Sequence, residues 1–103
     1  MNFDEYQKKA MQTAIYPESA KIIYPALGLA SEAGEVAGKV KKKIRDNQFD
    51  KNELAKEIGD CLWYCAAIAS DADLSLDEIA NQNIAKLEKR MKENKIQGSG
   101  DNR

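Results

Sequence analysis

The sequence predicts an all-α protein with a four-helix bundle-like fold that assembles into an oligomer. Apolar residues recur at spacings of three and four along four segments of the 103-residue chain. No stretch of useful length shows the period of two that is typical of a β-strand. Residues 61–69 are apolar or aromatic at every position, which predicts a helix buried on all sides. A chain of this size cannot bury such a helix alone, so we expect a homodimer or homotetramer.

Capping residues and prolines predict where the helices begin and end. The four helices are expected at about residues 3–15, 25–45, 51–70 and 76–93. Asn2 and Glu5 form a capping box before the first helix. That helix should end before Tyr16, because the residue before Pro17 avoids the α region. Pro25 suits the first turn of the second helix.

The later boundaries follow from the same signals. Asp50 provides a cap for the third helix, and residues 75–78 form a capping box for the fourth. Residues 1–97 are expected to form a single domain, and the polar ending 98–103 a flexible tail. Three glycines inside the second helix each cost about 1 kcal/mol relative to alanine, which indicates close approach by another backbone or a ligand, with helix flexibility as the alternative. They are Gly28, Gly34 and Gly38.

Composition argues against several classes of protein. The net charge of −1 gives no reason to expect nucleic-acid binding, and no 18-residue apolar run predicts a membrane span. The acidic N-terminus does not resemble a signal peptide, so we expect a cytoplasmic protein. The chain has no histidine, which removes imidazole bases and nearly all zinc or non-haem iron chemistry. Cys61 and Cys65 are expected to be buried apolar residues.

Two acidic quartets are the strongest candidate for a functional site. Residues 32–35 read Glu-Ala-Gly-Glu in the second helix, and residues 57–60 read Glu-Ile-Gly-Asp in the third. Each quartet places two carboxylates three residues apart on one face of its helix. If the two faces meet, the repulsion and desolvation of four carboxylates require cations. Hard oxygen ligands select Mg²⁺ or Mn²⁺, so the quartets predict a magnesium site that holds the phosphate chain of a nucleotide.

An alternative explanation is that these acids lie on solvated helix faces. With 17 acidic residues in 103, pairs at this spacing also arise by chance. The alternative function is a non-catalytic helical oligomerisation or regulatory module. The apolar and glycine-rich surroundings of both quartets favour the metal site, because ordinary exposed faces carry Lys and Gln between their acids.

At these residues the chain resembles the MazG-like, all-α nucleoside triphosphate pyrophosphohydrolases. The signature of that family is Glu-x-x-Glu, a spacer, and Glu-x-x-Asp, which matches both quartets. Further similarity surrounds the quartets, at residues 24–29, 36–42, 62–64 and 83–87 and at Arg90. The ending 98–103 is similar to that of short, phage-type members. One departure follows Arg90, where many members have Tyr-Pro and this chain has Met-Lys.

The resemblance implies a MazG-type fold and hydrolysis of a nucleoside triphosphate between its α and β phosphates, giving the monophosphate and pyrophosphate. It implies metal ligands at Glu32, Glu35, Glu57 and Asp60, with Glu35 as the first choice for a general base. Residues expected to steady phosphates or sugar are Lys39, Asn83, Lys86 and Arg90, together with Arg103 on a tail that closes as a lid. Trp63 and Tyr64 are expected in the core or an interface rather than stacked on a base.

Overall fold

Residues 1–102, the part of the chain that the computed structural model describes, contain four α-helices and one short 3-10 helix. In chain order they are α1 (Phe3–Met11), η1 (Glu18–Ala20), α2 (Ile23–Asp46), α3 (Lys51–Asp71) and α4 (Leu76–Lys92). No strand occurs in these residues, so the expected all-α class is confirmed. None of the helices within residues 1–102 combines the length and the hydropathy that crossing a membrane requires.

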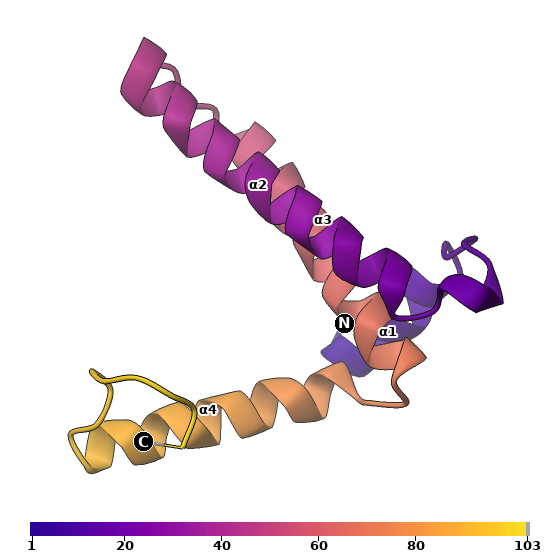
Figure 1. Cartoon of the computed structure of the whole chain (residues 1–103), viewed down its shortest axis with the longest axis vertical. Helices are drawn as coiled ribbons and strands as arrows, with labels where there is room; N and C mark the ends of the chain where they lie inside the picture. The colour runs from indigo at the N-terminus through magenta and orange to yellow at the C-terminus, as the bar shows by residue number, and fades with distance from the viewer. Residues whose placement is uncertain (103) are drawn as a thin grey trace.

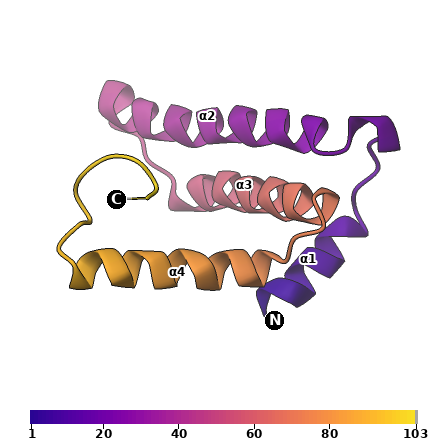
Figure 2. The same cartoon turned by 60° about the horizontal axis from the view of Figure 1, so that its bottom comes forward.

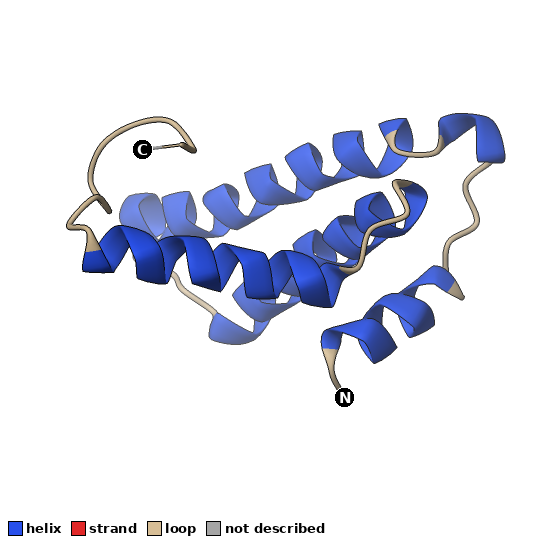
Figure 3. Cartoon of the chain, turned by 90° about the horizontal axis from the view of Figure 1, so that it is seen from below, coloured by secondary structure: helices blue, strands red, loops and turns tan. Residues whose placement is uncertain are grey.

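The helices form a long hairpin with one divergent arm. α2 and α3 run antiparallel and lie side by side, and α1 packs across α3 (Figures 1 and 2). α4 leaves the end of α3 at a wide angle to the hairpin (Figure 1). Loops alone connect the helices within the described residues (Figure 3). The Cα radius of gyration is 16.3 Å, whereas a compact domain of 100 residues has about 13 Å. The chain is therefore open rather than packed as a compact bundle.

Side-chain caps begin three of the helices, as the sequence predicts. The carboxamide oxygen of Asn2 accepts from the backbone N–H of Glu5 at 2.9 Å, and Glu5 completes the capping box of α1. Asp50 accepts from the first backbone N–H groups of α3. The hydroxyl oxygen of Ser75 accepts from the backbone N–H of Glu78 at 3.2 Å and caps α4. Each cap satisfies a donor that the helix itself leaves without a partner.

The first helix ends at Met11, four residues before the expected end at Ile15. The hydroxyl of Thr13 donates to the carbonyl of Ala10 at 2.7 Å, and its oxygen accepts from the indole N–H of Trp63 at 2.8 Å. A side chain that bonds nearby backbone in this way competes with helix formation. The earlier end therefore depends on a contact with a residue 50 positions away.

A small core and one glutamine join α1 to α3 and α4. Ala10, Ala66 and Leu76 are the buried members of this core. The side-chain amide of Gln7 donates to the hydroxyl of Ser70 at 2.8 Å and accepts from the backbone N–H of Leu76 at 2.8 Å. These bonds hold α1 and the start of α4 against the end of α3.

Gly28 is the one of the three α2 glycines whose missing side chain makes room for a neighbour. A Cβ atom at this position would overlap the ring of Tyr64, which crosses from α3 onto α2. A Cβ atom at Gly34 or Gly38 would meet nothing within 4 Å. The expected close approach therefore occurs at Gly28, where the neighbour is a side chain of the same chain.

Alanine substitutions at Gly28 and Gly38 should change stability in opposite directions. Gly28→Ala forces the Tyr64 ring to move, and overpacking of this kind costs about 1–3 kcal/mol. Gly38→Ala enters open space and gains up to about 1 kcal/mol of helix propensity. Urea unfolding of the two variants beside the parent protein measures both effects. Shifts of the same sign would contradict the packing described for Gly28.

Candidate metal centre

Three carboxylates from α2 and α3 meet in the hairpin. Glu32 of α2 and Glu57 and Asp60 of α3, named here the acid trio, each offer an oxygen within 4.8 Å of the other two. Glu57 and Asp60 share a helix face because they are three residues apart. Oxygens bound to one Mg²⁺ lie about 2.1 Å from the ion, hence at most about 4.2 Å from one another. Small side-chain adjustments would therefore bring the trio onto a single ion.

The acid trio carries unfavourable electrostatic energy. The pKa of the Glu32 carboxyl is raised, first by burial, then by its hydrogen bond to Glu57 and by the charges of Asp60, Glu57 and Glu35. Glu32 and Glu57 are half-buried and Asp60 is exposed. Like charges at this separation favour protonation or a bound cation. Oxygen-only donors without imidazole or thiolate fit the hard ions Mg²⁺ and Mn²⁺.

Glu35 and Lys39 lie on α2 beyond the trio. Glu35 is exposed and contributes charge to Glu32, yet it is not among the three acids whose oxygens converge. Lys39 lies further toward the C-terminal end of α2 and lines a hollow of about 360 Å³ with Phe49 and Glu53 among its other walls. The structure thus brings three of the four expected ligands together and leaves the fourth one turn away.

The expected phosphate ligands on α4 contact the C-terminal tail. Lys86 Nζ lies 2.7 Å from the carboxylate of Asp101, and Arg90, which is 6% exposed, lies 3.3 Å from the same carboxylate. Hydrogen bonds from Lys86 and Arg90 lower the pKa of the Asp101 carboxyl. Asn83 is exposed on the same helix, and Arg103 lies outside the described residues. A carboxylate therefore occupies the place between the two cations.

Two neighbours of these groups, Tyr64 and Asp101, are not among the site residues expected from the sequence. Burial raises the pKa of the Tyr64 hydroxyl, and so do its charge interaction and hydrogen bond with Tyr24 and the charges of Glu32 and Asp60. The Tyr64 ring therefore lies beside the acid trio. The spacing of four between Asp60 and Tyr64 is the signal that indicates it. Asp101 lies in a polar tail without periodicity, so no sequence pattern pairs it with α4.

The fold and the site together define an all-helical protein with a carboxylate cluster suited to a divalent metal. The chain belongs to the MazG family: the model of the MazG nucleotide pyrophosphohydrolase domain matches residues 25–94. This confirms the resemblance seen in the sequence, and the matched range contains both acidic quartets. The chain is also 41% identical over 114 aligned positions to the Gene 37 protein of Mycobacterium phage L5, covering 100% of both chains. No solved structure matches.

Glu32→Gln should stabilise the metal-free protein at neutral pH. The folded-state pKa of Glu32 lies above the ordinary value of 4.5, so the folded state loses stability as pH rises from that value through the raised pKa. Removing the carboxyl removes this loss, and the gain should vanish at pH values below both pKa values. Thermal unfolding in EDTA across this pH range measures the effect, and Glu88→Gln, at an exposed acid on α4 outside the trio, is the matched control.

The same variant should lose its response to magnesium. A ligand that binds only the folded state raises the unfolding midpoint, so Mg²⁺ should stabilise the parent protein and stabilise Glu32→Gln much less. An equal magnesium shift in both proteins would show that Glu32 does not contribute to the metal site.

Proposed function

We propose that this protein is a Mg²⁺-dependent nucleoside triphosphate pyrophosphohydrolase. It cleaves a (deoxy)nucleoside triphosphate between the α and β phosphates and releases the monophosphate and pyrophosphate. The observation that carries the proposal is the convergence of Glu32, Glu57 and Asp60 in a chain of the MazG family. A bound cation relieves the repulsion between carboxylates that lie this close together in the hairpin.

The acidic residues would have different roles in the site. Glu32, Glu57 and Asp60 would hold Mg²⁺, with Mn²⁺ as an alternative that the same oxygen donors accept. Bound Mg²⁺ supplies charge neutralisation for the phosphates and lowers the pKa of a coordinated water. Glu35, at the edge of the trio, would complete the ligand set or take the proton of the attacking water as the general base.

Basic and amide side chains would position the substrate. Lys39, on the same helix as Glu32, is the candidate phosphate ligand within the hairpin. Lys86 and Arg90 already hold a carboxylate, that of Asp101, which supports a role in holding an anionic phosphate oxygen. Asn83 lies near them on α4 and would contact sugar or phosphate. A lid formed by the tail, with Arg103 near phosphate, remains part of the proposal.

We further propose that the site is completed in a homodimer or homotetramer. α4 diverges from the hairpin, so its substrate-binding residues would meet an acid trio through assembly with a second copy (Figure 1). Large apolar side chains are exposed along both α2 and α4, which supports burial by another chain. They include Leu27, Ile44, Ile84 and Met91, at 68%, 82%, 55% and 71% exposure.

A pyrophosphate-release screen tests the proposed activity. Canonical and modified dNTPs are incubated with Mg²⁺ or Mn²⁺, and pyrophosphate and orthophosphate are measured separately. The proposal expects metal-dependent pyrophosphate from at least one nucleotide. Release of orthophosphate alone would assign a different cleavage. Absence of both products, with no stabilisation by Mg²⁺ and a non-hydrolysable dNTP, would favour the non-catalytic oligomerisation or regulatory module.

A further inference from the structure

The chain after α4 turns back toward the helix it has just left. Asn94 follows the end of α4 with a left-handed φ of 58°, and Gly98 and Gly100 have φ of 139° and 83°. Asparagine and glycine adopt such conformations at little cost. The backbone N–H of Lys95 donates to the carbonyl of Arg90 at 2.6 Å and closes the first turn. The tail therefore curves back beside α4 instead of extending away from it (Figures 1 and 2).

One acidic residue of the tail bonds two basic side chains of α4. The carboxylate oxygen Oδ1 of Asp101 accepts from Lys86 Nζ at 2.7 Å and from the Arg90 guanidinium at 3.3 Å. The same guanidinium nitrogen donates to the backbone carbonyl of Asp101 at 2.5 Å. Lys86 and Arg90 are four residues apart and share a helix face. These three bonds between Asp101 and α4 are named here the tail latch.

The tail latch pairs a buried cation with an exposed anion. The Arg90 side chain is 7% exposed, whereas that of Asp101 is 76% exposed. Within residues 1–102 both hydrogen bonds of the Arg90 guanidinium go to Asp101. A buried guanidinium requires such a partner, because removal of the anion leaves a desolvated charge without compensation. Contacts to an exposed carboxylate are weak and screened by salt. Another anion could therefore replace Asp101 at little cost.

The charge balance beside the latch favours an anion of higher charge. A hollow of about 310 Å³ is lined there by Lys86, Lys89, Arg90, Asp101 and Asn102. Its three cations exceed its one carboxylate, so it stays positive while the latch is closed. A phosphate group carries up to two charges and three acceptor oxygens. Ligand pockets begin at roughly 300 Å³, so this hollow suits a phosphate group or a short phosphate chain.

We propose that the tail latch is an autoinhibitory contact, in which the Asp101 carboxylate occupies the position that a phosphate of the substrate takes between Lys86 and Arg90. The inference rests on the proposed function, which assigns these two cations to the triphosphate. The nucleotide binds both cations only in molecules whose latch is open, so its apparent Kd is raised by the closed fraction. The displaced tail is then available to close over the nucleotide as the proposed lid.

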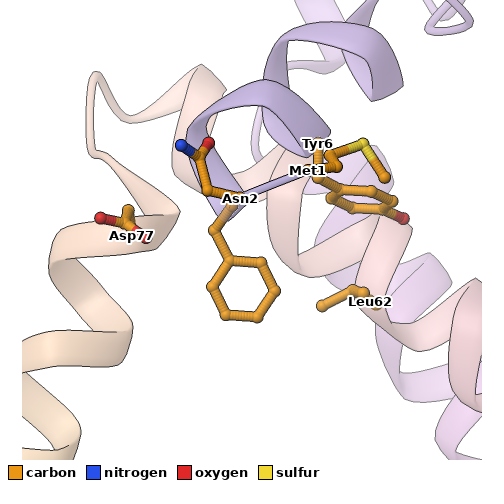
Figure 4. Close-up of a pocket in the computed structure, with 6 residues that line it drawn as sticks. Met1, Asn2, Tyr6, Leu62 and Asp77 are labelled. Atoms are coloured by element: carbon orange, nitrogen blue, oxygen red, sulfur yellow. The ribbon is translucent and has the colours of Figure 1, made fainter.

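A hollow near the other end of α4 provides the control position. It has a volume of about 390 Å³ and lies between α1, α3 and α4, with Tyr6 and Leu62 on one side and Asp77 on the other (Figure 4). The described residues that line it include no lysine or arginine, so it does not attract phosphate. Asp77 lies nine residues before Lys86, about 13 Å along the helix. Its carboxylate is therefore remote from the latch.

Calorimetric binding of inorganic tripolyphosphate with Mg²⁺ tests the inference. Asp101→Asn keeps the size of the side chain and removes its charge. Tripolyphosphate should bind this variant about tenfold more tightly than the parent, the factor expected if the latch is closed in about nine molecules of ten. Asp101→Glu restores the charge and should return the affinity toward that of the parent. Asp77→Asn, the matched control, should leave it unchanged.

A second measurement reports on the latch without any ligand. Backbone ¹⁵N order parameters of residues 99–102 should fall in Asp101→Asn, because the bonds that hold the tail on α4 are weakened. They should remain at the parent values in Asp77→Asn. Order parameters that stay unchanged in Asp101→Asn would show that the carboxylate does not hold the tail, and would overturn the inference.

The binding outcomes separate the latch from the proposed function. Unchanged or weaker binding of tripolyphosphate to Asp101→Asn would overturn the latch, and so would equal tightening by Asp77→Asn, which would reduce the effect to net charge. Failure of tripolyphosphate to bind any of these proteins would overturn it too, because the freed cations would hold no phosphate. Tighter binding to Asp101→Asn, without pyrophosphate release from any dNTP, would support the latch and remove the proposed function.

Discussion

Asp60→Asn is expected to lower the rate of pyrophosphate release by roughly 1,000-fold, the scale on which removal of one preorganised electrostatic partner acts. Asparagine preserves the size of the side chain and removes one of three charges that converge in the hairpin. Asp60 is exposed and caps no helix, so helical content should stay close to that of the parent. The unfolding midpoint in EDTA should not fall, because the substitution removes a charge that repels Glu32. Steady-state pyrophosphate release measures the change in rate, and circular dichroism measures the helical content and the unfolding midpoint.

The matched control for this variant is Asp73→Asn. It makes the same chemical change at an exposed residue outside the trio, where the backbone φ of 59° is one that asparagine adopts readily. Its activity should remain near that of the parent. An Asp60→Asn enzyme with parent-like turnover would show that the trio does not carry the reaction, whatever the protein hydrolyses.

Ile84→Asp is expected to convert the proposed oligomer to single chains and to abolish the proposed turnover with it. Ile84 is 55% exposed in one chain and lines an apolar hollow of about 490 Å³ on α4 with Leu87 and Met91. A carboxylate buried by a partner costs several kcal/mol, and about 1.4 kcal/mol already weakens association tenfold. Light scattering coupled to size-exclusion chromatography gives the mass.

Gln82→Asp is the control for the assembly prediction. It adds the same charge two residues away, on a different side of α4, and should leave the mass unchanged. An Ile84→Asp protein that keeps its assembled mass would place the subunit interface elsewhere. A single chain that retained full activity would show that α4 of a second copy contributes nothing to the site.

Local sequence signals predicted the helices well because capping acts through nearby backbone. Asn2, Asp50 and Ser75 each bond an N–H group two or three residues away, so the sequence alone contains the interaction. The end of α1 was wrong because it depends on a bond between Thr13 and Trp63, which only the folded chain brings together. The angle of α4 likewise follows from tertiary packing, which helical periodicity does not encode.

The sequence predicted which acidic residues could form the site, but not which of them converge. Spacing of three put Glu57 and Asp60 on one face, and both enter the trio. The same spacing rotates Glu35 about 60° from Glu32 around α2, so only the pose of α2 against α3 decides which of these two turns inward. The assignment of Glu35 as ligand and base stays a prediction.

The divergence of α4 has a consequence for how this protein should be studied in dilute solution. A chain whose exposed apolar side is covered only by a neighbouring molecule gains part of its folding free energy by mass action. Its melting temperature should then rise with protein concentration. At a single protein concentration, the measured effect of a mutation would combine its effect on folding with its effect on subunit association. A dilution series would separate the two.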